Sequence, residues 1–314
     1  MKVVFMGTPD FSVGALEAIL AAGHEVTAVV CQPDKPKGRS NEPKPCPVKE
    51  CALARGLEVF QPQRIRRPEA VEKLRRYPAD IFVVAAFGQI LPQEILDMPR
   101  YGCVNIHASL LPKYRGATPI QQAILNGDEK SGVTIMQMDA GIDTGDILLQ
   151  KEITLSEDET GGSLFERLSV CGAELIVTAL QKIEEGSIEP RKQDESQASH
   201  VGMLTKEDGR INWLRSAEEI ERMIRGLDPW PGAYTFLERK QLKIWKGKVI
   251  SGSVDENRAS HPAGCISRVE QNGFSVSCGK GELFITELQL EGKKRMPAED
   301  FLRGMRLQVG EHLG

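Results

Sequence analysis

Short apolar runs alternate with segments of helical periodicity through the first half of the chain. The runs are rich in valine, isoleucine and alanine, which is typical of strands buried on both faces of a parallel sheet. The predicted strands are residues 2–6, 25–31, 57–60, 80–85 and 102–106. The predicted helices, with apolar positions three or four apart, are residues 11–22, 47–55 and 69–76. This alternation predicts an α/β fold with a doubly wound, mostly parallel open sheet.

The pattern continues with a helix, two further strands and a long helix. These are expected at residues 117–125, 132–138, 146–153 and 163–185. Ser163 and Glu166 have the spacing of a capping box, whose side chains satisfy free amides at a helix N-terminus. The first turn, residues 7–10, lacks the Gly-x-Gly-x-x-Gly pattern, which disfavours a dinucleotide. Ligands of such sheets bind beyond the carboxyl ends of the strands, so polar residues there are the candidates for chemistry.

The second half of the chain has a different pattern. A polar segment, residues 186–205, is typical of a linker. A helix capped by Ser216 and Glu219 follows, and Trp230, in a proline-rich turn, is expected to be a packing anchor. Evenly spaced β-like runs, at residues 234–237, 241–246, 264–269, 274–276 and 283–290, then predict a small antiparallel barrel.

These boundaries divide the chain into a first domain at 1–189, a linker at 190–206 and a barrel domain at 207–314. The barrel resembles the oligonucleotide-binding type in its number of strands and their spacing. No internal repeat or low-complexity tract interrupts either part.

Composition narrows the class of protein. No apolar run approaches the roughly 20 residues that span a bilayer, and the first residues enter a strand rather than a targeting segment, so a cytoplasmic location is expected. The seven cysteines are scattered, which indicates reduced thiols. No cluster of histidine, cysteine and carboxylate has metal-ligand spacing, so no metal is expected. The net charge of −4 does not by itself indicate a nucleic-acid binder.

Three polar residues near the middle of the chain are candidates for catalysis. Asn105 and His107 are two apart on a predicted strand, so both should face the same side, roughly 7 Å apart. Asp143 lies in a Gly-Ile-Asp-Thr-Gly loop that can bring a carboxylate beside the imidazole. A hydrogen-bond donor, a base and a carboxylate that orients the base suit acyl transfer to an amine. The alternative is a structural histidine at a strand end, which is the commoner case.

The surrounding motif resembles a known family. Asn105-Ile-His107, followed by Ser-Leu-Leu-Pro-Lys-Tyr-Arg-Gly at 109–116 and by Asp143, is similar to the formyltetrahydrofolate-dependent formyltransferases, and among them to the branch that acts on methionyl-tRNA. The resemblance extends to residues 292–304 and so covers essentially the whole chain. It implies transfer of the formyl group of 10-formyltetrahydrofolate to the α-amino group of methionyl-initiator tRNA, with Asn105, His107 and Asp143 catalytic.

The resemblance also implies a folate site made by two segments. The expected contacts are Phe87, Gly88, Gln89, Ile90, Leu91, Ser109, Leu110, Leu111 and Pro112. For Phe87 and Ile90, packing in the core is an equally good interpretation of the residue type. Lys113 and Arg115 are expected to meet an anion or to face solvent, and Asp146 is expected to be a structural turn residue.

Two basic regions are the expected contacts with tRNA. Residues 32–47 form a proline-rich segment that excludes a helix or central strand and predicts a long exposed loop. The family carries a basic loop here, and Arg39 aligns with its key arginine, although residues 40–43 depart from the usual basic stretch. The predicted tRNA contacts are Lys35, Lys37, Arg39, Lys44, Lys243, Lys246 and Lys248. A solvated surface loop and a solvated strand face are the competing interpretations.

Two alternatives stay open from the sequence. Another formyltransferase, acting on glycinamide ribonucleotide or a sugar nucleotide, would share the three catalytic residues but would not need the barrel or the basic loop. The other alternative is a protein that binds RNA and whose α/β fold is catalytically inactive. The presence of all three candidate catalytic residues argues against it.

A monomer is expected.

Overall fold

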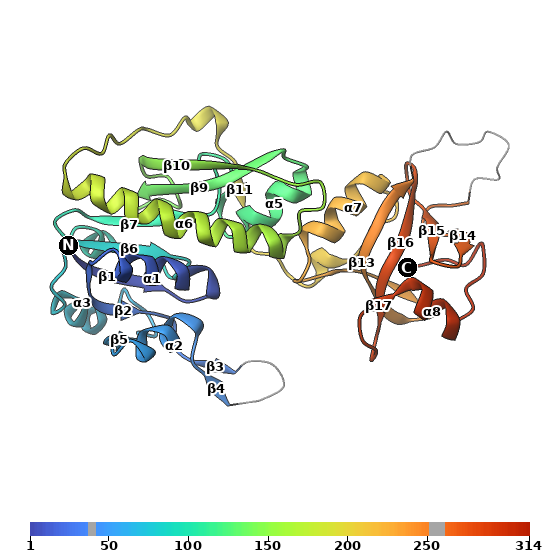
Figure 1. The fold of residues 1–314 in the computed structure, drawn as a ribbon, viewed down its shortest axis with the longest axis horizontal. Helices are drawn as coiled ribbons and strands as arrows, with labels where there is room; N and C mark the ends of the chain where they lie inside the picture. The colour runs from blue at the N-terminus through green and yellow to red at the C-terminus, as the bar shows by residue number, and fades with distance from the viewer. Residues whose placement is uncertain (37–41, 251–260) are drawn as a thin grey trace. The chain divides into compact units, whose positions relative to one another are not determined.

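The computed structural model describes residues 1–36, 42–250 and 261–314, and the chain forms two compact units (Figure 1). Unit 1 comprises Met1–Pro119, Lys130–Thr154 and Phe165–Gly202, and unit 2 comprises Ile120–Glu129, Leu155–Leu164 and Met203–Gly314. No helix in the described part of the chain has both the length and the apolar character needed to cross a bilayer.

Unit 1 is built on a seven-stranded sheet with strand order β10-β9-β7-β6-β1-β2-β5. In that order the strands are β10 (Ile147–Thr154), β9 (Lys130–Gln137), β7 (Cys103–His107), β6 (Ile81–Ala85), β1 (Lys2–Gly7), β2 (Glu25–Val30) and β5 (Val59–Phe60). The strands from β7 to β5 are parallel, while β9 and β10 are antiparallel to their neighbours. The predicted mostly parallel, doubly wound sheet is confirmed.

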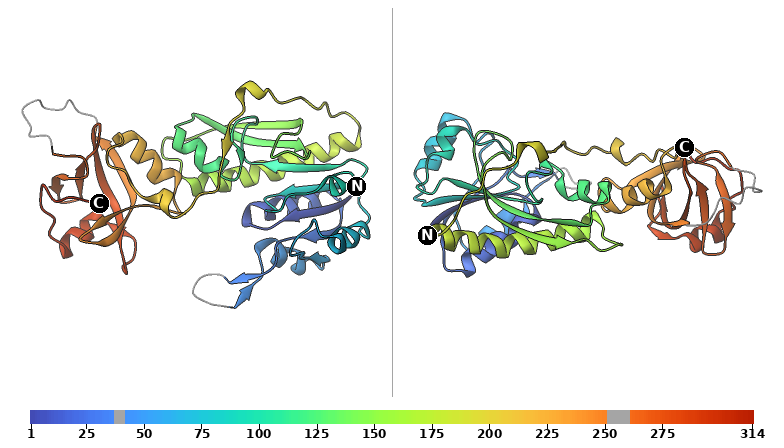
Figure 2. Two further views of the ribbon diagram at one scale, coloured as in Figure 1. Left: turned by 180° about the vertical axis from the view of Figure 1, so that it is seen from behind. Right: turned by 90° about the horizontal axis from the view of Figure 1, so that it is seen from above.

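Helices cover both faces of this sheet. They are α1 (Val13–Ala21), α2 (Pro47–Ala54), α3 (Pro68–Arg75), α4 (Gln93–Leu96) and α6 (Gly161–Glu184), with a 3-10 turn, η1 (Asp10–Ser12), before α1. The helix α5 (Pro119–Asn126) belongs almost entirely to unit 2. The long α6 runs along the sheet in Figures 1 and 2, and Gly172 lets it approach closely: a Cβ there would lie 2.9 Å from the Ile106 side chain. Leu74 of α3 and Ile95 of α4 are fully buried on the other face, in one cluster with Phe82.

Two local predictions differ from the structure. The long helix begins at Gly161, and its cap is made by Thr160, whose backbone N–H donates to Ser163 Oγ (2.9 Å) while Ser163 N donates to Thr160 Oγ1 (3.1 Å). The predicted capping box of Ser163 with Glu166 is therefore wrong, because Ser163 already lies inside the first turn. The proline-rich loop contains a two-stranded ribbon, β3 (Lys35–Pro36) paired with β4 (Pro43–Lys44).

The polar segment after α6 is hydrogen-bonded to unit 1 rather than extended away from it. It contains η2 (Glu195–Gln197) and β11 (His200–Val201), which pairs in parallel with β8 (Arg115–Gly116). Arg191 and Ile147 exchange backbone hydrogen bonds of 2.8 Å. The polar composition of this segment predicted a linker because hydrogen bonds, rather than buried apolar side chains, attach it to unit 1.

Unit 2 contains an antiparallel sheet with strand order β12-β13-β16-β15-β14, with β17 paired to β16. The strands are β12 (Ala233–Leu237), β13 (Lys240–Ile250), β14 (Ile266–Glu270), β15 (Gly273–Ser277), β16 (Glu282–Leu290) and β17 (Met296–Pro297). The other elements are η3 (Glu207–Gly209), α7 (Ala217–Gly226) and α8 (Ala298–Gly304). The predicted capping box of Ser216 and Glu219 on α7 is confirmed. Trp230 is 52% exposed, so its predicted role as a packing anchor is wrong.

The last residues of the chain join the two edges of this sheet. Ile266 N donates to Glu311 O (2.8 Å), and Leu313 N donates to Gly264 O (2.8 Å), both on the β14 side. Gly314 N donates to Phe236 O of β12 (3.0 Å), and the Leu313 side chain is fully buried. The strands therefore curl around one core, visible in orange and red in Figure 2, and we call this arrangement the unit 2 barrel.

Candidate active site

Asn105 and His107 lie at the carboxyl end of β7, on the same face of the sheet. Because side chains alternate along a strand, Ile106 points to the other face, where it meets Gly172 of α6. The backbone of β7 is paired on both sides, with β6 and with β9, which makes the strand a rigid support. His107 is only 6% exposed, while Asn105 is half-buried.

Asp143 lies in the loop between β9 and β10, and the backbone of this loop is tightly constrained. Its φ of +55° is a left-handed conformation that costs a non-glycine residue about 1 kcal/mol. Gly145 is packed so closely that a Cβ would lie 1.7 Å from the Gln137 carbonyl oxygen. The Asp139 side chain accepts a hydrogen bond of 2.6 Å from Thr144 Oγ1. These contacts fix the direction in which the Asp143 side chain leaves the loop.

The Asp143 carboxylate reaches both polar residues of β7. Its Oδ2 accepts a hydrogen bond from Gly116 N (2.8 Å) and lies 3.6 Å from His107 Nδ1. Its Oδ1 accepts a hydrogen bond from Asn105 Nδ2 at 3.4 Å. The structure thus brings together the three residues that the strand alternation and the loop pattern singled out.

The tautomer of His107 follows from its second contact. The ring Nε2 lies 2.9 Å from the Tyr114 carbonyl oxygen. A carbonyl oxygen can only accept, so Nε2 carries a hydrogen and the neutral ring has its free lone pair on Nδ1. That lone pair faces Asp143, so a proton taken up by Nδ1 would be stabilised by the neighbouring carboxylate.

Two residues beside the trio, Gln193 and Glu195, were not identified from the sequence, and both bind Arg115. Arg115 does not face solvent: its side chain is 2% exposed and donates to the Gln193 side-chain oxygen and to the Glu195 carboxylate. Its hydrogen bond with Glu195 raises the pKa of the arginine above its ordinary value. Gln193 and Glu195 are far from Arg115 in sequence, and no periodicity or motif connects such distant residues.

Comparisons with known proteins place the chain in a family. Residues 1–180 match the family model described as formyl transferase, and residues 203–306 match the model of the formyl transferase C-terminal domain. The chain belongs to the formyltransferase family. A relative from Agathobacter rectalis named methionyl-tRNA formyltransferase is 56% identical over 99% of this chain and 98% of its own length. A relative of the same name from Lachnospira eligens is 54% identical over the whole of both chains.

Solved structures share the fold at low sequence identity. An N-formyltransferase from Helicobacter canadensis, in complex with folinic acid and dTDP-3-aminofucose, has a TM-score of 0.65 and 21% identity, over 91% of this chain and 98% of that one. HypX from Aquifex aeolicus in complex with tetrahydrofolic acid has a TM-score of 0.60 and 16% identity, over 96% of this chain and 47% of that one.

In this formyltransferase the first expected folate segment divides into buried and exposed side chains. Phe87 (2% exposed) and Leu91 (4% exposed) belong to the core, whereas Ile90 is 75% exposed. Gln89 accepts a hydrogen bond from Ile65 N (2.6 Å) and braces a neighbouring turn. Gly88 has a positive φ of +81°, which turns the chain between the buried positions. Phe87 therefore packs in the core, whereas Ile90 does not.

The second expected folate segment is held by side-chain hydrogen bonds. Leu111 N donates to Thr134 Oγ1 (3.1 Å), and Ser109 Oγ donates to Lys113 O (2.6 Å). Gln150 Nε2 donates to Leu111 O (2.9 Å). Leu110 and Pro112 are only partly buried, so this fixed loop keeps some surface accessible.

The expected tRNA contacts lie on two strand surfaces of the formyltransferase. Lys35 and Lys44 are exposed and stand directly opposite each other in the β3–β4 ribbon, while Lys37 and Arg39 lie outside the described residues. The others are on β13: Lys243 is half-buried over Trp245, and Lys246 and Lys248 are exposed.

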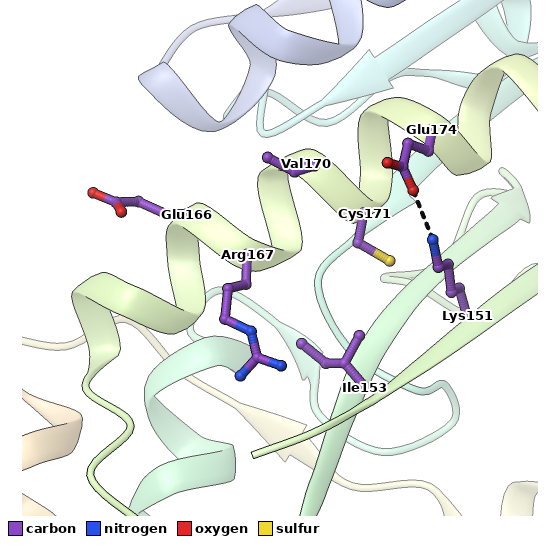
Figure 3. A pocket seen from close by; sticks show the side chains of 7 residues that line it. All are labelled: Lys151, Ile153, Glu166, Arg167, Val170, Cys171 and Glu174. Atoms are coloured by element: carbon purple, nitrogen blue, oxygen red, sulfur yellow. Dashed lines mark hydrogen bonds and ion pairs between the residues drawn. The ribbon is translucent and has the colours of Figure 1, made fainter. Parts of the chain in front are cut away.

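A shallow groove of about 410 Å³ lies between α6 and β10 (Figure 3). It is lined by Lys151, Ile153, Glu166, Arg167, Val170, Cys171 and Glu174. None of the predicted catalytic, folate or tRNA residues lines it, so it is distinct from the candidate active site. Within the described ranges, no group of three metal-ligating side chains is close enough to hold an ion.

Proposed function

We propose that this formyltransferase transfers the formyl group of 10-formyltetrahydrofolate to the α-amino group of methionyl-initiator tRNA. The observation that carries the proposal is the convergence of Asn105, His107 and Asp143 at the end of β7. The relatives named methionyl-tRNA formyltransferase, aligned over the whole chain, support the choice of acceptor.

The proposal gives each residue of the trio a role that the geometry supports. The amine nitrogen attacks the formyl carbon, and one N–H of Asn105 donates to the oxygen as negative charge grows on it. The other N–H is directed to Asp143 Oδ1. His107 Nδ1 takes the proton released by the attacking amine, directly or through water, and Asp143 stabilises the resulting imidazolium. The carbon–nitrogen bond to the folate N10 then breaks, and N10 receives the proton.

The folate donor is expected at the two segments 87–91 and 109–112. Ile90 presents a large apolar side chain to the surface beside otherwise buried neighbours, which suits contact with a flat aromatic ring. The loop from Ser109 to Pro112 is held in place from below by Thr134 and Gln150, so it needs no rearrangement to serve as a binding surface.

The acceptor is expected at the two lysine surfaces. Lys35 opposite Lys44 is a like-charge pair, which destabilises a ribbon unless a polyanion lies beside it. We assign residues 1–189 to catalysis and 207–314 to tRNA binding, with Lys243, Lys246 and Lys248 as contacts. The expected location is the cytoplasm, where charged tRNA is found, and a monomer stays the predicted state.

The test is a formyl-transfer assay with labelled 10-formyltetrahydrofolate and three acceptors in parallel. These are charged initiator Met-tRNA, charged elongator Met-tRNA and glycinamide ribonucleotide. The proposal predicts transfer to initiator Met-tRNA, loss of transfer in His107→Ala, and little transfer to the other two. Transfer confined to glycinamide ribonucleotide would preserve the chemistry but overturn the proposed acceptor.

A further inference from the structure

Residues 191–201, which we call the strap, lie against both loops that carry the candidate active site. The strap follows α6 and leads to β11 in Figure 1. Arg191 is paired with Ile147 at the start of β10, and Ser199 is paired with residues of the loop after β7. Arg115 N donates to Ser199 O (2.8 Å), and Tyr114 N donates to Ser199 Oγ (2.9 Å). The carbonyl partner of His107 therefore belongs to a residue that the strap holds.

One strap side chain binds the backbone of the Asp143 loop directly. Gln193 Nε2 donates to the carbonyl oxygens of Asp143 (2.8 Å) and Gly145 (2.7 Å). Its Oε1 accepts hydrogen bonds from Arg115 Nε (3.1 Å) and Nη2 (2.9 Å). Both amide hydrogens and the amide oxygen are thus used, and reversing the amide would place oxygen against two carbonyls and NH₂ against a guanidinium. The side chain has one orientation that satisfies all its partners.

Arg115 in turn cannot move without cost. Its guanidinium is almost fully buried, and a buried charge is tolerated only when it is paired and hydrogen-bonded. Glu195 supplies two carboxylate contacts, at 2.9 and 2.6 Å, and Gln193 supplies the third acceptor. Gly116, next to Arg115, binds the Asp143 carboxylate through its N–H, while Gln193, which Arg115 anchors, binds the Asp143 carbonyl oxygen.

We propose that Gln193, anchored by Arg115, is a positioning residue for Asp143 in the formyl-transfer reaction. Asp143 has a left-handed backbone conformation that is intrinsically unfavourable, so it needs such an external contact. The two hydrogen bonds from Gln193 hold that conformation and keep the carboxylate beside His107. The inference rests on the proposed function, because the geometry it maintains is that of the proposed catalytic trio.

The test compares three single variants in the formyl-transfer assay. Gln193→Ala removes the donors and is expected to lower kcat by about 10- to 100-fold, the cost of a misplaced catalytic group, with little change in KM for either substrate. Gln193→Glu keeps the contact with Arg115 but cannot donate to the two carbonyls, so it is expected not to rescue kcat. Gln197→Ala is the matched control, because Gln197 lies in the same strap and donates only to Asp194. It should behave like the unmodified enzyme.

If Gln193 acts through Asp143, the losses of kcat caused by the two substitutions should not be additive. Gln193→Ala should cause no further loss of kcat in an Asp143→Ala background, whereas a general loss of folding would lower activity in either background. The inference would be overturned if Gln193→Glu kept the kcat of the unmodified enzyme, or if the losses of kcat in the double variant were fully additive. The strap would then only connect α6 to the rest of the chain. A crystal structure of Gln193→Ala gives a readout independent of the acceptor: Asp143 should leave Gly116 N, and an unchanged contact would refute the proposal. An inactive unmodified enzyme would instead refute the proposed function.

Discussion

At the scale of single residues, the chemistry depends on which atom of His107 is free. The Tyr114 carbonyl occupies Nε2, so only Nδ1 can act as a base, and it lies 3.6 Å from Asp143 Oδ2. This separation is longer than a strong hydrogen bond, which leaves the lone pair accessible to a substrate proton. In the proposed reaction the carboxylate therefore acts by its charge, because Nδ1 of the resting imidazole carries no hydrogen to donate to it.

The charge of Asp143 can be tested by an isosteric change. Asp143→Asn retains an oxygen for Gly116 N but cannot stabilise an imidazolium, so kcat is expected to fall by about 10²- to 10⁴-fold in steady-state assays. Asp146→Asn is the control in the same turn, because Asp146 pairs with Lys192 rather than with the trio. Equal losses in both variants would contradict the assignment.

Residue identity and spacing predicted the trio but not its surroundings. Asn105 and His107 share a face because strand alternation is local, and local rules can be applied to a sequence. Arg115 and Gln193 meet only because the chain returns after α6, and their side chains carry no periodic signal. Ile90 illustrates a third case, since an isoleucine beside a buried strand is ordinarily core and its exposure is visible only in the fold.

At the scale of elements, a capping motif predicted the start of a helix correctly where the sequence offered a single candidate for the cap. Ser216 and Glu219 form the predicted capping box on α7. At α6 two hydroxyl residues compete, and the cap falls to Thr160 rather than to Ser163 because the helix includes two glycines that sequence propensity disfavours. The case of α6 shows that a cap motif can locate an N-terminus only to within a turn.

Removing the cap of α7 should weaken unit 2. Ser216→Ala is expected to lower the free energy of unfolding by about 1 kcal/mol, because Glu219 N loses its acceptor. Denaturant unfolding monitored by circular dichroism measures the change. Ser187→Ala, an exposed serine in unit 1 away from any helix start, should leave the midpoint unchanged, and an equal shift there would argue against capping as the cause.

The strap should loosen in acid. The hydrogen bonds from Arg115 hold the pKa of Glu195 below its ordinary value, so the contact is complete above that value and is lost as the pH falls through the lower, folded-state pKa. Amide hydrogen exchange at Arg115 N, corrected for intrinsic rates, should therefore be unchanged near neutral pH and become faster only when the pH falls below the ordinary range of a glutamate pKa. The acid-dependent part should be absent in Glu195→Gln, and its persistence there would exclude Glu195 as the titrating group.

At the scale of the whole molecule, the chain combines an α/β unit and a barrel unit, as the change in hydrophobic pattern predicted. The period of the apolar positions distinguishes the two classes, because strands buried on both faces and strands buried on one face have different patterns. The closing of the unit 2 barrel was not predictable, because it depends on backbone hydrogen bonds of residues 311–314, and backbone bonds leave no pattern in the side chains.

The two classes of substrate should respond differently to salt. Binding of a polyanion releases counterions, so log(kcat/KM) for Met-tRNA should fall linearly with log salt, while KM for the folate donor should change much less. Replacing Lys246 and Lys248 with glutamine should reduce the slope by about one per lost phosphate contact. Lys151→Gln is the control, because Lys151 lies on β10 and pairs with Glu174 of α6. An unchanged slope in the β13 variant would remove that strand from the tRNA surface.

The closing of the unit 2 barrel by residues 311–314 has a consequence during protein synthesis. The backbone of β12 and the start of β14 receive their last partners from Glu311, Leu313 and Gly314. A chain made from its N-terminus has completed unit 1 long before these residues leave the ribosome. Until they emerge, the start of β14 and the Phe236 end of β12 lack these backbone partners, and unpaired strand edges are templates for association with other chains. The emergence of residues 311–314 is thus the step that ends this period of vulnerability.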